Sequence, residues 1–488
     1  MLKSTLSVFI VSSLVLAGCA VGPDYRRPDA PAPVQYARKD AVPAGDVAAP
    51  AAGDAQFWQA FGDAQLSALI DAALTANNDL RGALARYDGA NALLREAKFD
   101  ALPTITASAQ GGHQQLSRDQ ALGGPRSARS YSAGINASWE LDLFGRVRRE
   151  IEAQRAETQA SAADLAAMQV AIAGQVASTY AQLRGLQERL RVARDNAANQ
   201  RETLSLVEAR YGAGRDTEFD LARARAQFET TSSRVPALEA QIAIAEHRLA
   251  VLSGRAPEAL IAELDPPQRL PALPQPIDPG TPGELLRRRP DIAAAEARLH
   301  AAAARVGVAT ADLFPRLSFS GLLGTQAFHH DALFKSGSET ASGFLGIDWS
   351  FLDVGRVRAR IAASRADAAA LLTQYQQTVL LALEDTENAL ILDARTRRED
   401  AQLERAAHDS ADAARLARVR YQAGVIDLYE VLDAERSLLA AQDAFADSHT
   451  RSATATVALY RALAGGWPQR MPVALSAATS AAEASRHD

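Results

Sequence analysis

Side chains able to catalyse a reaction or bind a metal are few and scattered in this sequence. Gly212-Ala213-Gly214 lacks the third glycine and the preceding strand of a nucleotide-binding loop. His329 and His330 have no second pair of ligands near them, which argues against a metal site. Neither HExxH nor GxSxG occurs. Asp433 and Arg436, one helical turn apart, have the spacing of an ordinary surface ion pair. We therefore expect no enzyme activity and no cofactor.

The one cysteine of the chain, Cys19, has the position of a modified residue. Residues 1–18 have the build of a secretory signal, because the apolar run Leu6–Leu16 is too short to span a bilayer as a helix. Leu16-Ala17-Gly18-Cys19 resembles the bacterial lipobox, in which this cysteine becomes the lipidated first residue. Two or three acyl chains would hold the protein firmly on a membrane. Ala20 in the next position resembles the form sent to the outer membrane.

Two stretches of the chain alternate apolar and polar side chains with a period of two. From Tyr131 to Asp142 the odd positions are apolar and the even positions are small or polar, as in a strand with two different faces. The stretch is as long as a tilted strand that crosses a bilayer, and Trp139 would lie at the membrane interface. Residues 343–351 repeat the pattern. The side chains expected to face lipid are Ile135, Trp139, Leu345, Ile347 and Trp349.

The same interval links many features of the two halves. Trp139 and Trp349 lie 210 positions apart, as do Gly214 and Gly424. After each alternating stretch comes a helical pattern with nearly seven-residue periodicity; the first, over about 65 residues, would be about 100 Å long. Each long helix ends at a glycine-containing turn and returns. The chain is therefore predicted to be two tandem copies of one strand and helix unit.

These patterns predict the following organisation. Residues 1–18 are a signal peptide, and residues 19–56 are a lipidated, extended segment. The first repeat covers 57–263, with a β-hairpin at about 104–142 and a long helical hairpin at about 146–254. A proline-rich linker, 264–282, leads to the second repeat, 283–467, with hairpins at about 317–352 and 356–464. Residues 468–488 are expected to form a disordered tail.

Four strands per chain would leave two open sheet edges, which hydrocarbon does not tolerate. Other copies of the chain must then complete the sheet. A dimer would give eight strands, a width that side chains fill, whereas a trimer gives twelve and leaves room for water. The small, polar inward set favours the trimer; it comprises Ser132, Gly134, Asn136 and Ser138. The predicted fold is thus mainly α with a membrane β-barrel. The net charge of −6 is spread along the helices and offers no nucleic-acid surface.

Several short motifs, in order along the chain, resemble those of the outer-membrane factor family, the TolC-like export ducts, in their lipoprotein branch. They are the lipobox followed by residues 22–28 (GPDYRRP), residues 285–292 (LLRRRPDI), the strand exits 144–146 (FGR) and 354–356 (VGR), the two Arg-Tyr-x-Ala-Gly turns, and residues 464–467 (AGGW). The resemblance covers essentially the whole chain after the signal.

The resemblance implies a homotrimer with a twelve-stranded β-barrel in the outer membrane and a twelve-helix α-barrel in the periplasm. Such a channel docks on a periplasmic adaptor driven by an inner-membrane pump, here of the resistance-nodulation-division type. It passes small molecules to the exterior. The chain would then be the outer-membrane channel of a tripartite efflux system.

Two groups of residues match functional regions of that family. The turns between the long helices resemble the tips that contact the adaptor, and the same glycines also let the chain reverse. These residues are Gly212, Ala213, Gly214, Asp216, Thr217, Ala423, Gly424, Val425 and Asp427. A periplasmic gate is implied at Tyr421, Tyr429, Asp433 and Arg436. Tyr429 departs from the leucine common in relatives, and the first half has Arg223 in place of Asp433.

A second class of function remains open on the residues alone. A non-conducting coiled-coil lipoprotein that links the outer membrane to the periplasm needs only the lipobox and the helical repeats. It does not explain two amphipathic hairpins with polar faces, and it would tolerate a charge at Ile135 or Ile347. A substrate-specific uptake porin would not need the long helices.

Overall fold

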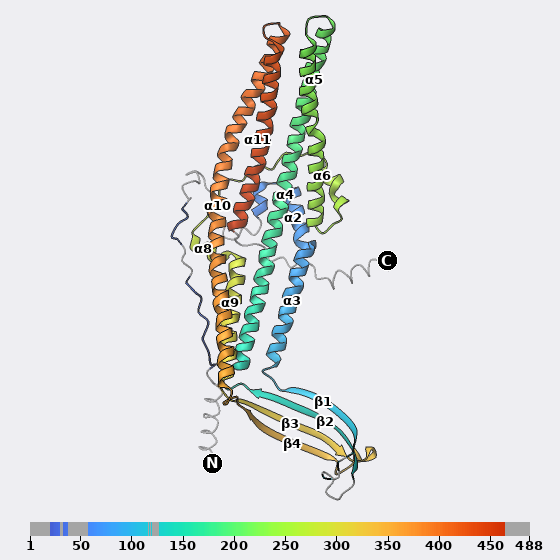
Figure 1. Ribbon diagram of the computed structural model, residues 1–488, viewed down its shortest axis with the longest axis vertical. Coiled ribbons are helices and arrows are strands. Elements are labelled where there is room, and N and C mark those ends of the chain that lie inside the picture. Colours follow the sequence, from blue (N-terminus) through green and yellow to red (C-terminus); the bar gives the residue numbers. More distant parts are fainter. Residues whose placement is uncertain are drawn as a thin grey trace. The chain divides into compact units, whose positions relative to one another are not determined.

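Helices separated by two pairs of strands make up the chain, in the order expected of a duplicated unit (Figure 1). The computed structural model describes residues 20–29, 33–37, 57–115, 117, 119 and 126–463. The predicted signal peptide, Cys19 and the tail from 468 onward lie outside these residues. The helical content and the two repeats confirm the predicted fold class.

The two repeats share the order of their main elements, which is two helices, two strands and a long helical hairpin. The first contains η2 (Phe57–Phe61), α2 (Ala64–Ala76), α3 (Asn78–Phe99), β1 (Thr104–Gln115), β2 (Ser127–Leu141), α4 (Arg146–Gly212), α5 (Glu218–Ser232), α6 (Arg234–Leu252), η3 (Pro257–Leu260) and α7 (Ile261–Leu264). The second contains α8 (Pro282–Arg288), α9 (Pro290–Ala311), β3 (Arg316–Ala327), η4 (His330–Ala332), β4 (Glu339–Asp348), α10 (Val354–Gln422) and α11 (Leu428–Leu463).

The chain folds as two compact units, and each unit takes segments from both repeats. Among the described residues, unit 1 takes its segments from 20–29, 86–162 and 294–377, and unit 2 takes its segments from 33–85, 163–293 and 378–463. Unit 1 carries the strands, and unit 2 carries the helical hairpin turns. Each unit is therefore built from segments of both repeats.

The strands of unit 1 form one antiparallel sheet in the order β1-β2-β3-β4. The two hairpins are joined through β2 and β3, where Ile135 pairs with Leu323 and Trp139 with Phe319. At one point of this seam the two backbones approach so closely that only glycine fits. A Cβ on Gly324 would lie 2.4 Å from the carbonyl oxygen of Ala133, and its pairing partner is Gly134. Such a glycine pair permits the sheet to bend locally.

Two tryptophans at the helical end of the sheet make equivalent hydrogen bonds to backbone carbonyl groups. The indole Nε1 of Trp139 donates to the carbonyl oxygen of Ala101 at 3.1 Å, and that of Trp349 donates to Leu313 at 3.0 Å. Trp349 was expected within the second hairpin, which was predicted to extend to about 352. The strand ends at Asp348, one residue before Trp349, because the chain turns at Ser350 to Asp353 and enters α10.

Long helical hairpins dominate the remainder of the chain. The outgoing helices α4 and α10 contain 67 and 69 residues. The return helix is continuous in the second repeat, as α11, but is divided into α5 and α6 in the first. Pro236 explains this break: its ring lacks an N–H and conflicts with the carbonyl of Ser232, four residues earlier. The equivalent residue of the second repeat is Ala446, which keeps α11 intact.

The end of each return helix in unit 2 is bound by a polar side chain from the start of the same repeat. The buried amide of Asn77 donates to the carbonyl oxygen of Leu252 at 2.9 Å. In the second repeat the Arg289 guanidinium donates to the carbonyl oxygen of Ala462 at 3.2 Å. Leu252 and Ala462 are 210 positions apart, so two different side chains satisfy the same unpaired helical carbonyl.

The segment that follows Cys19 lies extended on unit 1. Val21 N–H donates to the carbonyl oxygen of Phe144 at 3.0 Å. The Asp24 carboxylate lies 2.6 Å from the buried guanidinium of Arg149. The ring of Tyr25 stacks on His300 with centroids 4.3 Å apart. These contacts give the GPDYRRP motif a structural role that the alternation pattern of the sequence did not reveal.

Candidate channel wall and helical tips

The register of the sheet places most apolar side chains of the four strands on one face, with Leu322 and Phe344 on the other. Directly paired residues of an antiparallel sheet share a face. Ile105 pairs with Ala137, and Phe319 pairs with Leu345, so the residues of one face can be followed across all four strands. The face contains Ile105, Ala107, Ala109, Ala133, Ile135, Ala137, Trp139, Leu317, Phe319, Leu323, Leu345 and Ile347. Ile135 is 54% exposed and Ile347 68% exposed, so within one chain this apolar face is uncovered.

The opposite face consists mainly of small and polar side chains. It includes Thr106, Ser108, Ser132, Gly134, Asn136, Ser138, Ser320 and Ser342. The amide of Asn136 donates to the hydroxyl of Ser108 at 2.9 Å, which links neighbouring strands on this face. The sheet thus has the two chemically different faces that a wall between lipid and water requires.

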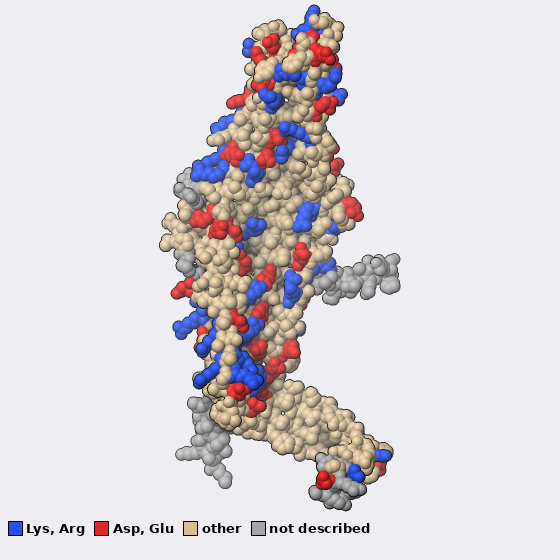
Figure 2. Space-filling view, in the orientation of Figure 1, with Lys and Arg blue, Asp and Glu red and all other residues tan. Residues whose placement is uncertain are grey.

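Charged residues occupy the ends of the strands. Arg129 and Glu339 lie toward the hairpin loops, and Glu140, Arg316 and Asp348 toward the helices. The surface of the sheet visible in Figure 2 is accordingly without Lys, Arg, Asp or Glu over most of its length. The uncharged band is of the kind that fits the hydrocarbon layer of a bilayer.

The edges of the sheet have no strand partner among the described residues. Strands β1 and β4 each pair on one side only. Every residue of β1 is exposed. An exposed edge of a long strand presents unpaired N–H and C=O groups with which a strand of another chain can pair.

Both helical hairpins of unit 2 turn with the same backbone bonds. Arg215 N–H donates to the carbonyl oxygen of Arg210 at 2.9 Å, and Val425 N–H donates to that of Arg420 at 2.9 Å. Gly214 and Gly424 have φ of 69° and 72°, a conformation that favours glycine. The structure exposes the predicted tip residues Gly212, Ala213, Gly214, Thr217, Ala423, Gly424, Val425 and Asp427.

Asp216 differs from the other predicted tip residues. Its side chain is only 9% exposed and lies 3.1 Å from the guanidinium of Arg210. The hydroxyl of Tyr421 donates to its Oδ2 at 3.1 Å. Burial and then the neighbouring Asp216 raise the pKa of Tyr421 to about 12. Asp216 therefore joins the two hairpins rather than presenting its carboxylate to solvent.

The four predicted gate residues do not form one cluster in the chain. Asp433 and Arg436 are paired, with side chains 45% and 72% exposed. Tyr429 is 57% exposed, and the guanidinium of Arg223 lies 5.0 Å from its ring. Tyr421 is buried and bonded to Asp216. The aromatic residues thus contact the first hairpin, while the acid and the arginine contact each other.

Sequence reasoning missed a buried carboxylate near these residues. Glu435 on α11 is only 1% exposed. It accepts from the hydroxyl of Thr203 at 2.7 Å and from Arg418 Nε at 2.9 Å. Arg418 also donates to Asn199 at 3.2 Å. A charge-assisted bond of this kind makes burial of the carboxylate acceptable. We call these four residues the Glu435 cluster.

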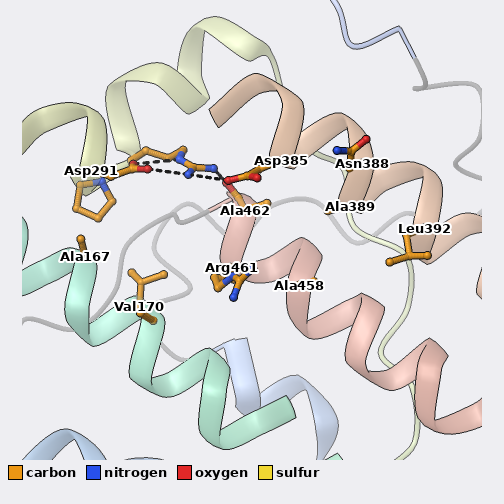
Figure 3. Close-up of a pocket in the computed structure, with 13 residues that line it drawn as sticks. Ala167, Val170, Asp291, Asp385, Asn388, Ala389, Leu392, Ala458, Arg461 and Ala462 are labelled. Carbon is orange, nitrogen blue, oxygen red and sulfur yellow. Dashed lines mark hydrogen bonds and ion pairs between the residues drawn. The ribbon is translucent and has the colours of Figure 1, made fainter. Parts of the chain in front are cut away.

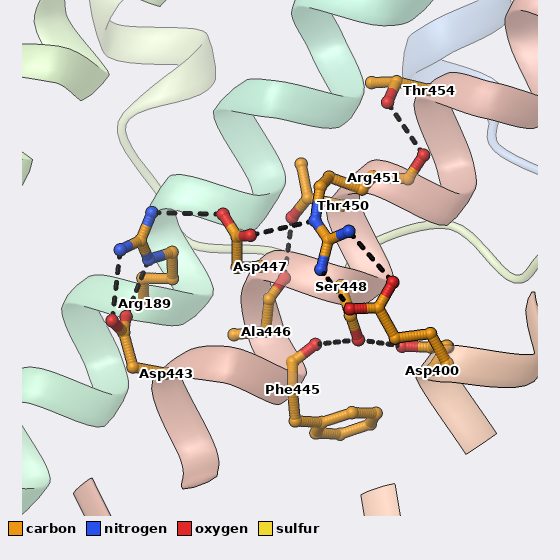
Figure 4. A network of polar contacts seen from close by, with 11 residues as sticks. Arg189, Asp400, Asp443, Phe445, Ala446, Asp447, Ser448, Thr450, Arg451 and Thr454 are labelled. Atoms are coloured by element: carbon orange, nitrogen blue, oxygen red, sulfur yellow. Dashed lines mark hydrogen bonds and ion pairs between the residues drawn. The ribbon is translucent and has the colours of Figure 1, made fainter. Parts of the chain in front are cut away.

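Further polar contacts join α4, α10 and α11 in unit 2 (Figure 4). Arg189 on α4 lies 2.7 Å from Asp443 and 3.4 Å from Asp447 on α11. Ser448 on α11 donates to Asp400 on α10 at 2.7 Å. The first and second hairpins are therefore held together by ion pairs as well as by apolar packing.

A hollow of about 430 Å³ lies in unit 2 near the start of α9 (Figure 3). Small side chains such as Ala167, Ala389 and Ala458 line much of it. Its most buried charge, Arg289, is paired with Asp291 at 2.7 Å and with Asp385 at 3.3 Å. Arg289 and its two carboxylate partners are thus engaged in joining α9 and α10.

No helix within the described residues is both long enough and apolar enough to cross a lipid bilayer. The duplicated fold, the two-faced sheet and the long helical hairpins together define the class of envelope-spanning channel proteins. The model of the outer membrane efflux protein family matches residues 69–255 and 281–465, one match for each repeat. The chain belongs to this family.

Individual relatives agree with this assignment. The outer membrane protein OprJ of Pseudomonas aeruginosa is 34% identical over 463 residues, 94% of this chain and 95% of that protein. Nodulation protein T of Rhizobium leguminosarum bv. trifolii is 31% identical over 445 residues, 89% of this chain and 91% of that protein. The solved outer-membrane channel OprN has 42% identity and a TM-score of 0.84, covering 92% of this chain and all of that one.

The family confirms the resemblance inferred from the sequence motifs. The protein is an outer-membrane channel for efflux, and it spans the outer membrane and extends into the periplasm. This outcome favours the channel over the alternative of a non-conducting structural lipoprotein.

Proposed function

We propose that three copies of the chain form a conduit through the outer membrane, closed by a twelve-stranded barrel. The unpaired edges of β1 and β4 are the observation that supports this most directly. In hydrocarbon each unpaired backbone group costs several kcal/mol, so β4 of one copy pairs with β1 of the next. Four strands from each of three copies give the width that admits water.

In such a barrel the apolar face of the sheet contacts lipid and the polar face lines the lumen. The lipid contacts include Ile135, Trp139, Leu345, Ile347 and Trp349. Trp139 and Trp349 bind carbonyl groups at the helical end of the sheet, which suits the interfacial position of aromatic residues in membrane barrels. Serine, threonine and glycine on the other face favour passage of hydrated small molecules.

The helical hairpins of the three copies form a twelve-helix tube in the periplasm. Its exposed turns, including Gly214 and Gly424, contact a periplasmic adaptor, which connects the channel to an inner-membrane pump of the resistance-nodulation-division type. Their exposure supports this role. Asp216 contributes by fixing the two hairpins to each other through Tyr421, and it is itself paired with Arg210 of its own hairpin.

Cys19 carries the lipid that anchors each copy in the outer membrane. The segment directly after it is fastened to unit 1, the unit that holds the sheet, by Asp24 with Arg149 and by Arg27 with Glu296 at 2.9 Å. These contacts would keep the acyl chains near the lipid-facing part of the protein.

The gate lies at the periplasmic ends of the helices. Three copies of Asp433 around one axis would repel one another unless Arg436 compensates them, and the observed pair supplies that compensation. Tyr421 holds the second hairpin to the first through Asp216. Tyr429 and Asp433 together narrow the lumen until the adaptor separates the helices.

Recording of ion current in planar bilayers tests this function. The purified wild-type protein should insert and remain mostly closed, whereas Y421F/D433A should conduct in discrete steps, because both bonds at the helical ends are removed. Glu430→Ala, an exposed change on the same helix, should behave as the wild type. A trimer that inserts but never conducts in either form would contradict the channel proposal.

A further inference from the structure

Residues of the two helical hairpins correspond one to one at an interval of 210. The turn bonds from Arg215 to Arg210 and from Val425 to Arg420 have the same donor and acceptor positions and the same length of 2.9 Å. Contacts made by one hairpin can therefore be compared with those of the equivalent residues in the other.

The Glu435 cluster lies where the first hairpin packs on the second within one chain. Thr203 and Asn199 of α4 face Glu435 of α11 and Arg418 of α10. The covered positions on α4 are buried: Thr203 is 7% exposed. A ring of hairpins needs a second kind of contact, in which α10 of one chain faces the first hairpin of the next chain.

Two of the four positions equivalent to the Glu435 cluster have inverted charges, and a third is an acid in place of an amide. Arg225 takes the place of Glu435, Glu208 that of Arg418, Asp409 that of Asn199 and Ala413 that of Thr203. Arg225 and Glu208 lie 4.0 Å apart in the first hairpin, as Arg418 and Glu435 are paired in the second.

These equivalent side chains are exposed in the single chain. The side chains of Arg225, Glu208 and Asp409 are 59%, 51% and 87% exposed. The imidazole of His408 lies 3.7 Å from the Asp409 carboxylate. The face of α10 that carries Asp409 and Ala413 is thus uncovered, whereas the matching face of α4 is covered by α11.

We propose that a second copy of this chain covers that face, and that Arg225 of one chain binds Asp409 of the next. The inference rests on the proposed trimer and names its helical contact. Arg225 would bridge its own Glu208 and the neighbouring Asp409, because a guanidinium has enough donors for two carboxylates. In the contact between chains, the small side chain of Ala413 leaves space for Arg225. In the Glu435 cluster the equivalent residue, Thr203, contacts Glu435, whose side chain is shorter than that of arginine. The contact between chains is then a charge-inverted copy of the Glu435 cluster.

Disulfide trapping tests the position of the contact. In R225C/A413C, mild oxidation of the full-length protein in outer membranes should link each chain to its neighbour and give covalent dimers and trimers that reduction separates. Each single variant should remain unlinked. A protein that is trimeric by light scattering but yields no link between chains would overturn this inference alone. A protein that is not trimeric would overturn the proposed function with it.

Charge reversal tests the pairing itself. R225D and D409R should each lower the temperature at which the detergent-solubilised trimer dissociates, and R225D/D409R should recover most of the loss. Far-UV circular dichroism checks that every variant keeps its helices. Glu404→Arg is the matched control on α10. The residue equivalent to Glu404 in the first hairpin is Arg194, which pairs with Glu239 of its own hairpin at 2.6 Å. Position 404 is therefore not expected to lie at the contact between chains. If R225D/D409R lowers the dissociation temperature by as much as the two single changes added together, the ion pair is excluded.

Discussion

At the scale of single residues, one hydroxyl group joins the two helical hairpins. Tyr421→Phe removes the bond to Asp216 but keeps the ring, which is buried and lies 4.9 Å from the guanidinium of Arg210. A hydrogen bond to a charged group contributes about 1.5 to 3 kcal/mol, so a loss near the lower limit is expected in the free energy of unfolding. Urea unfolding of the solubilised protein measures it; an unchanged midpoint would show that the bond is not stabilising.

The stability difference between the wild type and Tyr421→Phe should diminish in alkaline solution. The pKa of Tyr421 is raised in the folded state, to about 12, so its stabilising effect is complete below the unfolded pKa of about 10 and is lost as the pH rises toward 12. The stability advantage of the wild type over Tyr421→Phe should therefore shrink between these values. An advantage that grows with pH would have the wrong sign.

The buried carboxylate of the Glu435 cluster should be more costly to remove. Glu435→Ala leaves Arg418 without its main partner and a void among α4, α10 and α11, which is expected to cost about 3 kcal/mol. Thermal unfolding followed by circular dichroism measures the loss. Glu430→Ala, exposed on the same helix, should change stability by less than about 0.5 kcal/mol. Equal effects of the two changes would place Glu435 among the solvated residues.

The difference between Asp433 and Glu435 shows where sequence reasoning at the residue scale stops. Both acids lie on one helix, two positions apart, and both have an arginine partner. The partner of Asp433 is three residues away and can be read from the sequence. The partner of Glu435 is on α10, and its burial depends on how α4 packs against α11, which the helical periodicity alone does not specify.

At the scale of elements, the faces of the strands could be predicted because a period of two assigns each residue to a side. The pairing across β1, β2, β3 and β4 agrees with that alternation. The division of the return helix could not be expected from apolar spacing, which continues through it. Pro236 was the available signal, since it disrupts the backbone bond to Ser232.

Charge on the two faces of β2 should have different effects. Ile135→Arg places a guanidinium on the apolar face near the middle of the strand and is expected to cost about 2 to 4 kcal/mol in the bilayer. The adjacent change Asn136→Arg points to the opposite face and should leave assembly intact while altering ion selectivity. The yield of heat-modifiable trimer in outer membranes measures assembly. Equal yields from both variants would mean that the apolar face does not contact lipid.

At the scale of the whole molecule, the proposed lipid anchor and the proposed barrel belong to the same unit, unit 1. The segment from Val21 to Asp29 is fixed to unit 1 by the ion pairs of Asp24 and Arg27, directly after Cys19. Labelling of growing cells with an alkyne fatty acid should mark the wild-type protein and leave Cys19→Ser unmarked. Equal labelling of both would remove Cys19 as the site of acylation.

The central claim is that one chain cannot complete its own sheet, and the number of chains in the purified channel tests it most directly. Native mass spectrometry of the full-length protein released from detergent micelles should give three copies, whose twelve strands close the barrel. A stable monomer, or a dimer with eight strands, would contradict the account.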